Sequence, residues 1–408
     1  MSAATNSYSI CGSIDGIICD LLSYICQVIV RYLNIPIQVD IAAGGIIDPL
    51  ISSMFHTPNP PAYIPQIGMM ATNKMNLLQR TLNFILCYIL ADIGHWWIFN
   101  IHLYSKFNLT NLGFTSLPME YDRRSTFLLV NGDFALDYPR PLAPHIKFVG
   151  PILAKPANQL PPPLQTFITA NTNGTLLVAF GTVVTELNSV YNVSLLFQTF
   201  AQLPYNVMWA YTGQFPSSLD VSSNIQLYKW LPQNDVLGHP NIVGFVTHCG
   251  VNSVLEASYH GVPIVGLPVA GDQVTSAQKV LSKNTGIIIN PKAITKQILL
   301  NAIIKVATDP WIRGNASRVG QLMRNRPNHR TPRQETADWI EFALRCDGGN
   351  YLRSEEYHLP WYQLYLIDVL IVIAIILYLF GTLLVWLYQW IAIKCSTSQS
   401  KPLKVKMT

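Results

Sequence analysis

The segment THCGVNSVLE, residues 247–256, combines groups that can bind an anion. Gly250 permits a tight turn, and the residues directly after it are predicted to begin a helix. The first N–H groups of that helix, near Asn252 and Ser253, have no partner within the helix, and phosphate is the anion that such groups commonly bind. His248 lies beside them and can donate to the same phosphate. The segment therefore predicts a phosphate site.

Side chains around this segment fit the other parts of a nucleotide-sugar. Trp230 ends a strand-like run, where its ring can stack on a nucleobase, and Gln233 can reach the base or the ribose. Glu256 lies one turn inside the helix, where it would repel a phosphate at close range, so we expect it to accept hydrogen bonds from ribose hydroxyls. Asp272 and Gln273 suit the hydroxyls of a sugar. Together these residues predict a site for a base, a ribose, a diphosphate and a sugar.

Each of these side chains also has an ordinary structural interpretation. His248 alone would more often be a hydrogen-bonded structural histidine, and Trp230 alone would more often belong to a core. Glu256 alone would be a solvated residue on a helix face. The joint spacing of all these groups favours the ligand interpretation.

Alternating runs indicate the sheet that positions these residues. Strands are predicted at 175–180, 206–211, 225–230, 242–247, 263–268 and 286–290. Helices are predicted at 189–202, 251–260, 274–284, 293–308 and 311–325. Such alternation predicts a parallel sheet with helices on both faces, and ligands bind at the carboxyl ends of its strands. His248, the pair Asp272–Gln273 and the pair Gly181–Thr182 all follow predicted strands.

The first part of the chain predicts an earlier β-α-β unit. Strand-like runs at 14–20 and 37–42 flank a helical run at 21–36. The apolar run at 84–99 is short and carries an aspartate and a histidine, which favours a buried helix over a membrane span. Residues 131–163 are rich in proline and predict a loop-like linker or domain boundary.

Composition bounds the class of protein. Of the 408 residues, 50% are hydrophobic and 12% are charged, which is too apolar for a disordered chain. The net charge of +5 comes without a long run of basic residues among aromatics, so no nucleic-acid partner is expected. The seven cysteines are scattered without a Cys-x-x-Cys pair, so neither a disulfide framework nor a zinc or other metal site is predicted.

The uncharged run at 369–393 predicts a transmembrane helix. As a helix it would be about 37 Å long, enough to cross a bilayer core of about 30 Å. Tryptophans and tyrosines flank it as interfacial anchors do. Lysines follow it and acidic residues precede it, which places the tail, 394–408, in the cytosol.

Other signals bear on the compartment. The last residues, KVKMT, resemble a dilysine retrieval signal of endoplasmic reticulum membrane proteins. Four Asn-x-Ser/Thr sequons, at Asn108, Asn173, Asn192 and Asn315, fit a luminal body. Against this topology, the first 20 residues show no signal peptide. We expect a single-pass protein of the endoplasmic reticulum membrane with a luminal body.

From Trp230 to Gln273 the sequence resembles the donor-binding signature of the UDP-glycosyltransferase family. The matching blocks are WLPQNDVLGHP, FVTHCGVNS, HGVPIVGLP and GDQ. Segments such as NGDFALDYPRPLAPHIKFVGPI and WIEFALR extend the resemblance over nearly the whole chain. The C-terminal span and lysine tail resemble the membrane-bound branch, whose best-known members are UDP-glucuronosyltransferases.

The resemblance implies an α/β protein with the GT-B fold, two Rossmann-like domains with the active site between them, followed by a transmembrane helix. We expect the N-terminal domain to be truncated. The implied divisions are a partial acceptor-side domain at 1–150, a UDP-sugar-binding domain at 151–345, a luminal connector at 346–368, the span at 369–393 and the basic tail at 394–408.

The family's donor-binding roles carry over by motif match. Trp230 would stack on uracil, Gln233 would approach the uridine, and Glu256 would hold the ribose. Asp272 and Gln273 would hold the sugar. The diphosphate would contact His248, Gly250, Asn252 and Ser253, and the pair Gly181–Thr182 would let the backbone approach it. Departures from the family pattern at Val251 and Ala210 leave the identity of the sugar open.

The family inverts the sugar's configuration through a histidine base that an aspartate orients. Asp20 in IICDLL matches the orienting aspartate. The resemblance places the histidine roughly a hundred residues earlier, and no residue of this sequence matches it. His56, His95, His102 and His145 match no catalytic motif.

Two hypotheses follow. The first is an enzyme that transfers glucuronic acid, or alternatively glucose, from a UDP-sugar to a hydroxyl of a small lipophilic acceptor, with no cofactor because the UDP-sugar is a co-substrate. The second is an inactive UDP-sugar-binding or interaction protein. Besides donor, acceptor and bilayer, related chains are expected partners in a homo- or hetero-oligomer. We expect this chain to bind donor but to transfer sugar poorly.

Overall fold

The structure is a computed structural model with two compact units, Met1–Arg353 and Ser354–Thr408. It describes residues 14–21, 23, 26, 29–30, 32–46, 48–55, 57–89, 125–181, 190–211, 213, 222–327, 329–352, 354–355 and 359–399. Within the predicted helix at 21–36, residues 22, 24–25, 27–28 and 31 lie outside these residues, and residues 26, 29–30 and 32 are helical.

The first unit begins with a parallel sheet in the strand order β1-β2-β3-β4. Its strands are β1 (Gly16–Asp20), β2 (Ile37–Ala42), β3 (Ser125–Val130) and β4 (Ile146–Phe148). β1 and β2 match the predicted strands. β4 lies inside the region predicted as a linker, and this prediction was wrong there, because a three-residue strand is too short to show a periodic pattern.

Two segments far apart in sequence cover this sheet. On one face, α2 (Leu50–Met54) packs Ile51 against the strands. On the other, α13 (Pro332–Arg345) packs Trp339 and Phe342 around Phe127, with ring centroids 5.7 and 5.9 Å from that of Phe127. α13 starts with a reciprocal capping box and a proline at its first position. The end of the region predicted as the second domain thus returns to the first sheet.

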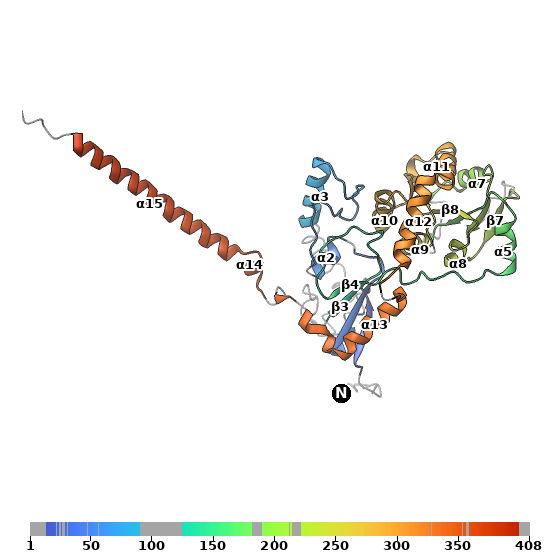
Figure 1. The fold of residues 1–408 in the computed structure, drawn as a ribbon, viewed down its shortest axis with the longest axis horizontal. Coiled ribbons are helices and arrows are strands. Elements are labelled where there is room, and N and C mark those ends of the chain that lie inside the picture. Colours follow the sequence, from blue (N-terminus) through green and yellow to red (C-terminus); the bar gives the residue numbers. More distant parts are fainter. Residues whose placement is uncertain are drawn as a thin grey trace, which may run out of the picture. The chain divides into compact units, whose positions relative to one another are not determined.

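The second sheet is parallel and has the order β10-β9-β8-β5-β6-β7. Its strands β7 and β8 are labelled in Figure 1. Its strands are β5 (Thr175–Ala179), β6 (Asn206–Ala210), β7 (Ile225–Tyr228), β8 (Ile242–Thr247), β9 (Ile264–Gly266) and β10 (Gly286–Ile288). Each falls within a predicted strand. These strands are nearly continuous apolar runs, as expected where both faces of a sheet are buried.

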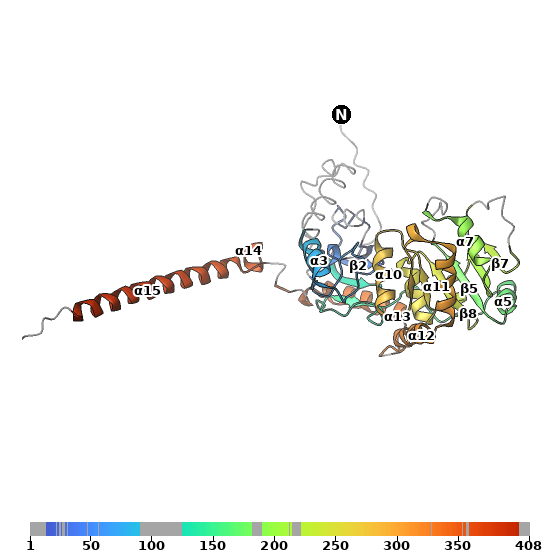
Figure 2. The same cartoon turned by 90° about the horizontal axis from the view of Figure 1, so that it is seen from above.

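Helices cover both faces of this second sheet. The face with Leu177 and Phe245 packs against α5 (Pro162–Thr169), α8 (Gln233–Leu237), α9 (Val251–His260), α10 (Asp272–Ser282) and α12 (Pro310–Arg324). The opposite face packs against α7 (Val193–Phe200) and α11 (Lys296–Thr308), which lie side by side in Figure 2. The predicted parallel sheet with helices on both faces is confirmed.

The apolar run at 84–99 was predicted as a buried helix. Its described part belongs to α3 (Leu77–Ile89), where Phe84 is 55% exposed and Tyr88 is 54% exposed. The buried residues of this helix are Asn83 and Cys87. The run is helical over 84–89, as predicted, but the predicted burial was wrong there. Residues 90–99 lie outside the described residues.

Cys19 and Cys26 form a disulfide, with their Cα atoms 5.8 Å apart. The expectation that the cysteines carry no disulfide was wrong for this pair. A separation of seven residues matches no cysteine motif, and the two sulfurs meet only because the chain turns back after β1. Cys87, Cys249 and Cys346 are free thiols.

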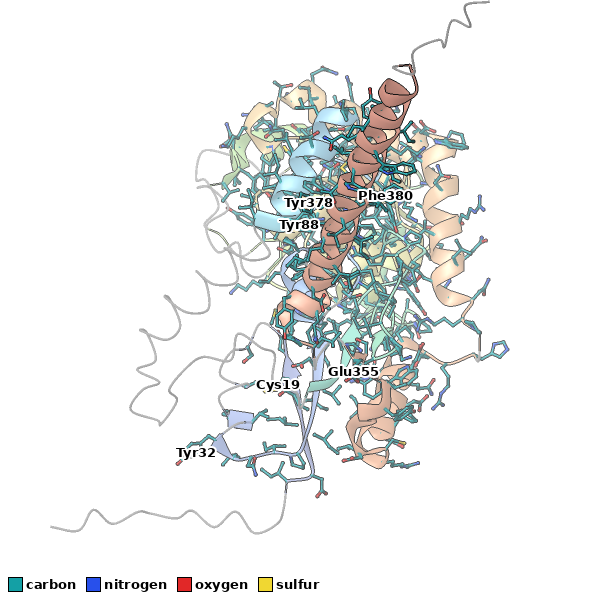
Figure 3. All side chains as sticks on the ribbon, turned by 90° about the vertical axis from the view of Figure 1, so that its left-hand side faces the viewer. Cys19, Tyr32, Tyr88, Glu355, Tyr378 and Phe380 are labelled. Atoms are coloured by element: carbon teal, nitrogen blue, oxygen red, sulfur yellow. A yellow bond between two sulfur atoms is a disulfide. The ribbon has the colours of Figure 1, made fainter. Side chains whose placement is uncertain are left out.

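The second unit contains a short helix, α14 (Trp361–Leu364), and a long helix, α15 (Ile367–Gln399). Residues Ile367–Ile393 are apolar and long enough to cross a membrane. Their side chains, including the Tyr378 and Phe380 rings labelled in Figure 3, are exposed. A helix of this length with exposed apolar side chains is suited to a lipid environment, so α15 fits the predicted span.

Candidate donor-binding site

The predicted donor-binding residues follow the carboxyl ends of the second sheet. β5 and β8 are neighbours in the sheet. The chain continues from β5 to β6 on one side and from β8 to β9 on the other, so the loops after β5 and β8 lead toward opposite edges of the sheet. Ligands of open parallel sheets bind at such a switch point. Gly181 follows β5 and His248 follows β8, and both lie at this point.

Two glycines make room for the imidazole of His248. A Cβ atom at Gly181 would lie 2.7 Å from Cε1 of the ring, and one at Gly250 would lie 2.6 Å from Nε2. Both distances are too short for real atoms. Gly181 also has a φ of +75°, a conformation that side chains disfavour. The imidazole can therefore occupy its place at the start of α9 only because Gly181 and Gly250 have no side chains.

The His248 side chain is buried, with 8% of the residue exposed. Its Nδ1 lies 3.3 Å from Oγ1 of Thr247. Burial lowers the pKa of His248, while the nearby carboxylate of Asp272 opposes this shift. The imidazole is consequently neutral at physiological pH, and one ring nitrogen carries a proton that it can donate.

The N-terminus of α9 is open. Its N-cap is Gly250, and no side chain among the described residues caps the helix. Asn252 in the first turn is exposed, and Ser253 next to it is buried. Together with the neighbouring His248, the free N–H groups of this turn can bind an anion.

Gln233 and Glu256 form a polar pair beside this turn. Nε2 of Gln233 donates to Oε2 of Glu256 at 2.6 Å and to Oγ of Ser253 at 3.2 Å. Burial raises the pKa of Glu256, the hydrogen bond from Gln233 lowers it, and Asp235 raises it further. The structure thus brings together three residues that the sequence analysis assigned to uridine, ribose and diphosphate.

The remaining predicted residues lie at other carboxyl ends of the same sheet. Trp230 follows β7 and is 75% exposed, so the alternative that it belongs to the core is wrong. Asp272 and Gln273 open α10, and Oε1 of Gln273 accepts from the backbone N–H of Val269 at 2.9 Å. Thr182 lies outside the described residues.

One residue that contacts the site was not predicted. Nδ2 of Asn131, which follows β3 in the first sheet, donates to Oδ1 of Asn252 at 2.9 Å. A signal was present, because Asn131 directly follows the apolar run TFLLV. The region after it was interpreted as a linker, so this strand and its carboxyl end were missed.

The candidate catalytic residue and the unassigned histidines lie in the first part of the chain. Asp20 is the last residue of β1 and is exposed. His145 is buried, with its ring 6.4 Å from that of Phe55. His56, His95 and His102 lie outside the described residues. Within the described part of the chain, no three metal-binding side chains gather.

The family described as "UDP-glucoronosyl and UDP-glucosyl transferase" matches residues 8–400. The chain belongs to the UDP-glycosyltransferase family. It is 35% identical over 343 residues to human 2-hydroxyacylsphingosine 1-beta-galactosyltransferase, covering 82% of this chain and 60% of that protein. It is 33% identical over 316 residues to human UDP-glucuronosyltransferase 2A3, covering 77% of this chain and 58% of that protein.

Among solved structures, the calicheamicin glycosyltransferase CalG4 is similar with a TM-score of 0.53 at 20% sequence identity. The match covers 81% of this chain and 74% of that chain. The fold of this UDP-glycosyltransferase family member is therefore GT-B, with two parallel α/β sheets. The chain spans about 60% of the length of the human galactosyltransferase.

Proposed function

We propose that this protein binds a UDP-sugar at the carboxyl ends of the second sheet and transfers the sugar, with inversion, to a hydroxyl group. The observation that carries the proposal is the placement of His248 at the open N-terminus of α9, beside the Gln233–Glu256 pair. An anion-binding helix end next to a half-buried carboxylate that can accept from hydroxyls fits a diphosphate joined to a ribose.

Each part of the donor has residues of suitable chemistry. The exposed ring of Trp230 stacks on uracil, Gln233 approaches the uridine, and the carboxylate of Glu256 accepts from the ribose. Around the diphosphate lie Gly181, His248, Gly250, Asn252 and Ser253. Asp272 and Gln273 at the start of α10 bind hydroxyls of the sugar. Asp20 matches the aspartate that orients the family's base histidine, and no residue of this sequence matches that histidine.

The sugar that we propose is glucuronic acid, and the acceptor is a small lipophilic hydroxyl compound. Similarity to UDP-glucuronosyltransferases supports this choice. Similarity to a galactosyltransferase makes galactose the main competitor, with glucose third. A lipophilic acceptor suits a chain whose α15 fits a bilayer, because such compounds partition into membranes.

We further propose that the protein lies in the endoplasmic reticulum membrane with its first unit in the lumen and its tail in the cytosol. The Cys19–Cys26 disulfide supports a luminal first unit, because disulfides form and persist in oxidising compartments. The lysines after α15 support a cytosolic tail. Pairing with related chains stays a prediction.

Donor choice is tested by titrating the full chain in detergent with UDP-glucuronic acid, UDP-galactose and UDP-glucose. Binding does not depend on the acceptor base, so this test isolates the donor side. Tightest binding of UDP-glucuronic acid supports the finer proposal, and preference for a neutral sugar replaces glucuronic acid with that sugar. Binding of none of the three contradicts the proposed function.

Transfer is tested separately, by incubating the same protein with the preferred donor and a panel of phenols. We expect a β-linked glycoside that forms slowly, because no residue of this sequence matches the family's base histidine. A product with retained configuration would contradict the inverting mechanism.

A further inference from the structure

We propose that Asn131 is a positioning residue that turns the amide of Asn252 so that its NH₂ group faces the donor diphosphate. The inference rests on the proposed UDP-sugar site. Asn131 directly follows β3 of the first sheet, whereas Asn252 lies in the first turn of α9, which packs on the second sheet. The residue therefore makes the first sheet part of the donor site.

The backbone around Asn131 fixes the orientation of its side chain. Nδ2 donates to the carbonyl of Ala43 at 2.8 Å, and Oδ1 accepts from the N–H of Ile152 at 3.0 Å. A flipped amide would set oxygen against the Ala43 carbonyl and NH₂ against the Ile152 N–H. Asn131 is also buried, with 4% of the residue exposed. One N–H of the Asn131 Nδ2 group is used by Ala43, and the other is consequently directed toward Asn252.

This bond determines what Asn252 offers to a ligand. Oδ1 of Asn252 accepts from Asn131, so the NH₂ group of Asn252 faces away from that contact. Asn252 is exposed in the first turn of α9, where the anion site lies. An NH₂ group donates to a phosphate oxygen, whereas the carbonyl oxygen would repel it. Fixing the amide in advance removes the cost of turning it when the donor binds.

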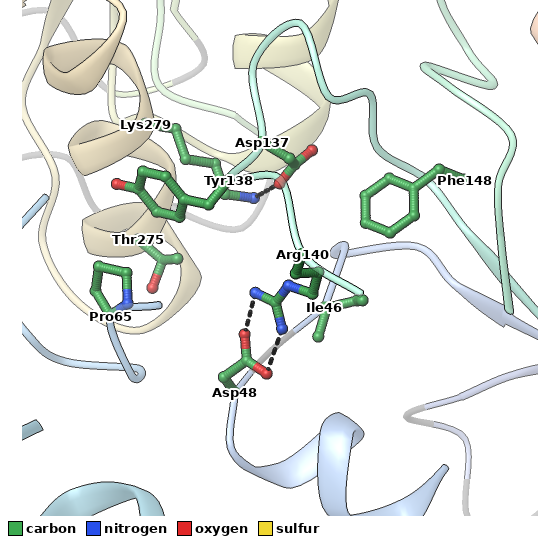
Figure 4. A pocket seen from close by; sticks show the side chains of 9 residues that line it. All are labelled: Ile46, Asp48, Pro65, Asp137, Tyr138, Arg140, Phe148, Thr275 and Lys279. Atoms are coloured by element: carbon green, nitrogen blue, oxygen red, sulfur yellow. Dashed lines mark hydrogen bonds and ion pairs between the residues drawn. The ribbon is translucent and has the colours of Figure 1, made fainter. Parts of the chain in front are cut away.

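The segment that carries Asn131 also contacts α10, the helix that Asp272 and Gln273 open. Asp137 forms an ion pair with Lys279 on α10, and Nζ of Lys283 donates to the carbonyl of Phe134 at 3.4 Å. Figure 4 shows the Asp137–Lys279 pair beside a small cavity. Asn131 is thus one end of a segment held against both α9 and α10.

The test uses the full chain in detergent, titrated with UDP and with uridine, which lacks the diphosphate. Asn131→Asp keeps the acceptor for Ile152 but offers Asn252 only an acceptor, so the Asn252 amide should turn its oxygen toward the diphosphate. We expect UDP affinity to fall about tenfold or more, as for loss of a hydrogen bond to a charged group, with uridine affinity unchanged. Asn131→Ser, with a side chain too short to reach, should shift the ratio in the same direction.

Asn83 provides a matched control. It too is a buried asparagine that donates to two carbonyls, of Pro61 and Ile64, and accepts from the N–H of Gln66. Asn83→Ala should lower the melting temperature without changing the ratio of UDP to uridine affinity. A purely structural role for Asn131 would give the same pattern and overturn the inference.

A double-mutant cycle separates positioning from direct repulsion. In an Asn252→Ala background, Asn131→Asp should cause no further loss of UDP affinity, because there is no amide to turn. A loss that persists in this background overturns the inference while leaving the proposed function intact. If the unaltered chain binds no UDP, the proposed function fails, and this inference fails with it.

Discussion

Nε2 of Gln233 lies 2.6 Å from Oε2 of Glu256, joining the residue that opens α8 to a carboxylate inside α9. Gln233 follows β7 at one edge of the sheet, whereas Glu256 follows β8 near its centre. The bond occupies one carboxylate oxygen and orients the side chain. The other oxygen can then accept from a ribose hydroxyl, which makes the pair the structural basis of nucleoside recognition in our proposal.

Uridine affinity should fall as the pH is lowered through the mildly acidic range. Burial raises the pKa of Glu256, so its carboxylate takes up a proton above the pH at which an ordinary glutamate does. Uridine favours the ionised form, and the protonated form loses acceptor capacity. Uridine has no phosphate of its own to titrate. Titration calorimetry at a series of pH values should show this slope in the unaltered protein and a flat profile in Glu256→Gln; an unchanged slope in the variant would rule out Glu256 as its source.

Trp230→Ala should weaken UDP binding by about 1–3 kcal/mol, the range for a base stacked on an aromatic side chain. Trp311 is the matched control, since 68% of the residue is exposed and it lies on α12, which carries none of the predicted site residues. Trp311→Ala should leave UDP affinity unchanged. Equal affinities for both variants, measured by calorimetry, would remove Trp230 from the site.

Gly181→Ala should impair diphosphate binding. The added Cβ meets the His248 ring at 2.7 Å, and the backbone φ of +75° adds strain. Displacing the imidazole removes a hydrogen bond to a charged group, worth about 1.5–3 kcal/mol. Gly314→Ala is the control, because nothing lies within 4 Å of a Cβ there and alanine favours the helix. UDP affinity that survives in Gly181→Ala would show that His248 does not need this space.

Glycosylation should distinguish the described sequons. Asn173 and Asn192 are exposed, whereas Nδ2 of Asn315 is buried within α12. A luminal first unit should therefore carry glycans at Asn173 and Asn192 but not at Asn315. The measurement is the shift in gel mobility after glycosidase treatment of the three Asn→Gln variants expressed in mammalian cells. A shift that disappears only in Asn315→Gln would contradict the helix packing, and the absence of any glycan would argue against the luminal location.

The sequence predicted the second sheet well because each of its strands and helices has a clear pattern of apolar residues and ends at a glycine, proline or polar turn. β8 and α9 match their predicted ranges, since an apolar run meets a Gly-containing turn and then a helix ending at Gly261. The positions of His248 and Glu256 followed from those boundaries. The close approach of Gly181 to His248 could not be predicted from them, because it joins two loops about seventy residues apart in sequence.

Contacts that depend on tertiary packing escaped prediction for a related reason. α13 covers the first sheet although it follows α12 of the second, and chain order gives no sign of this return. Asn131 reaches Asn252 across 121 positions. The Cys19–Cys26 disulfide depends on a turn whose pattern resembles no cysteine motif. The partners of α13 and Asn131 are set by the arrangement of the two sheets, whereas the disulfide is set by the path of the chain directly after β1.

The most direct test of the donor site is calorimetric titration of the full chain in detergent with UDP. The account predicts one saturable site whose affinity drops in His248→Ala, with the protein still folded. His239→Ala is the control, because His239 bonds to Gln165 at 3.1 Å and lies outside the proposed site. The absence of heat at millimolar UDP, or equal affinity in His248→Ala and the unaltered chain, would contradict the assignment of this site to a UDP-sugar.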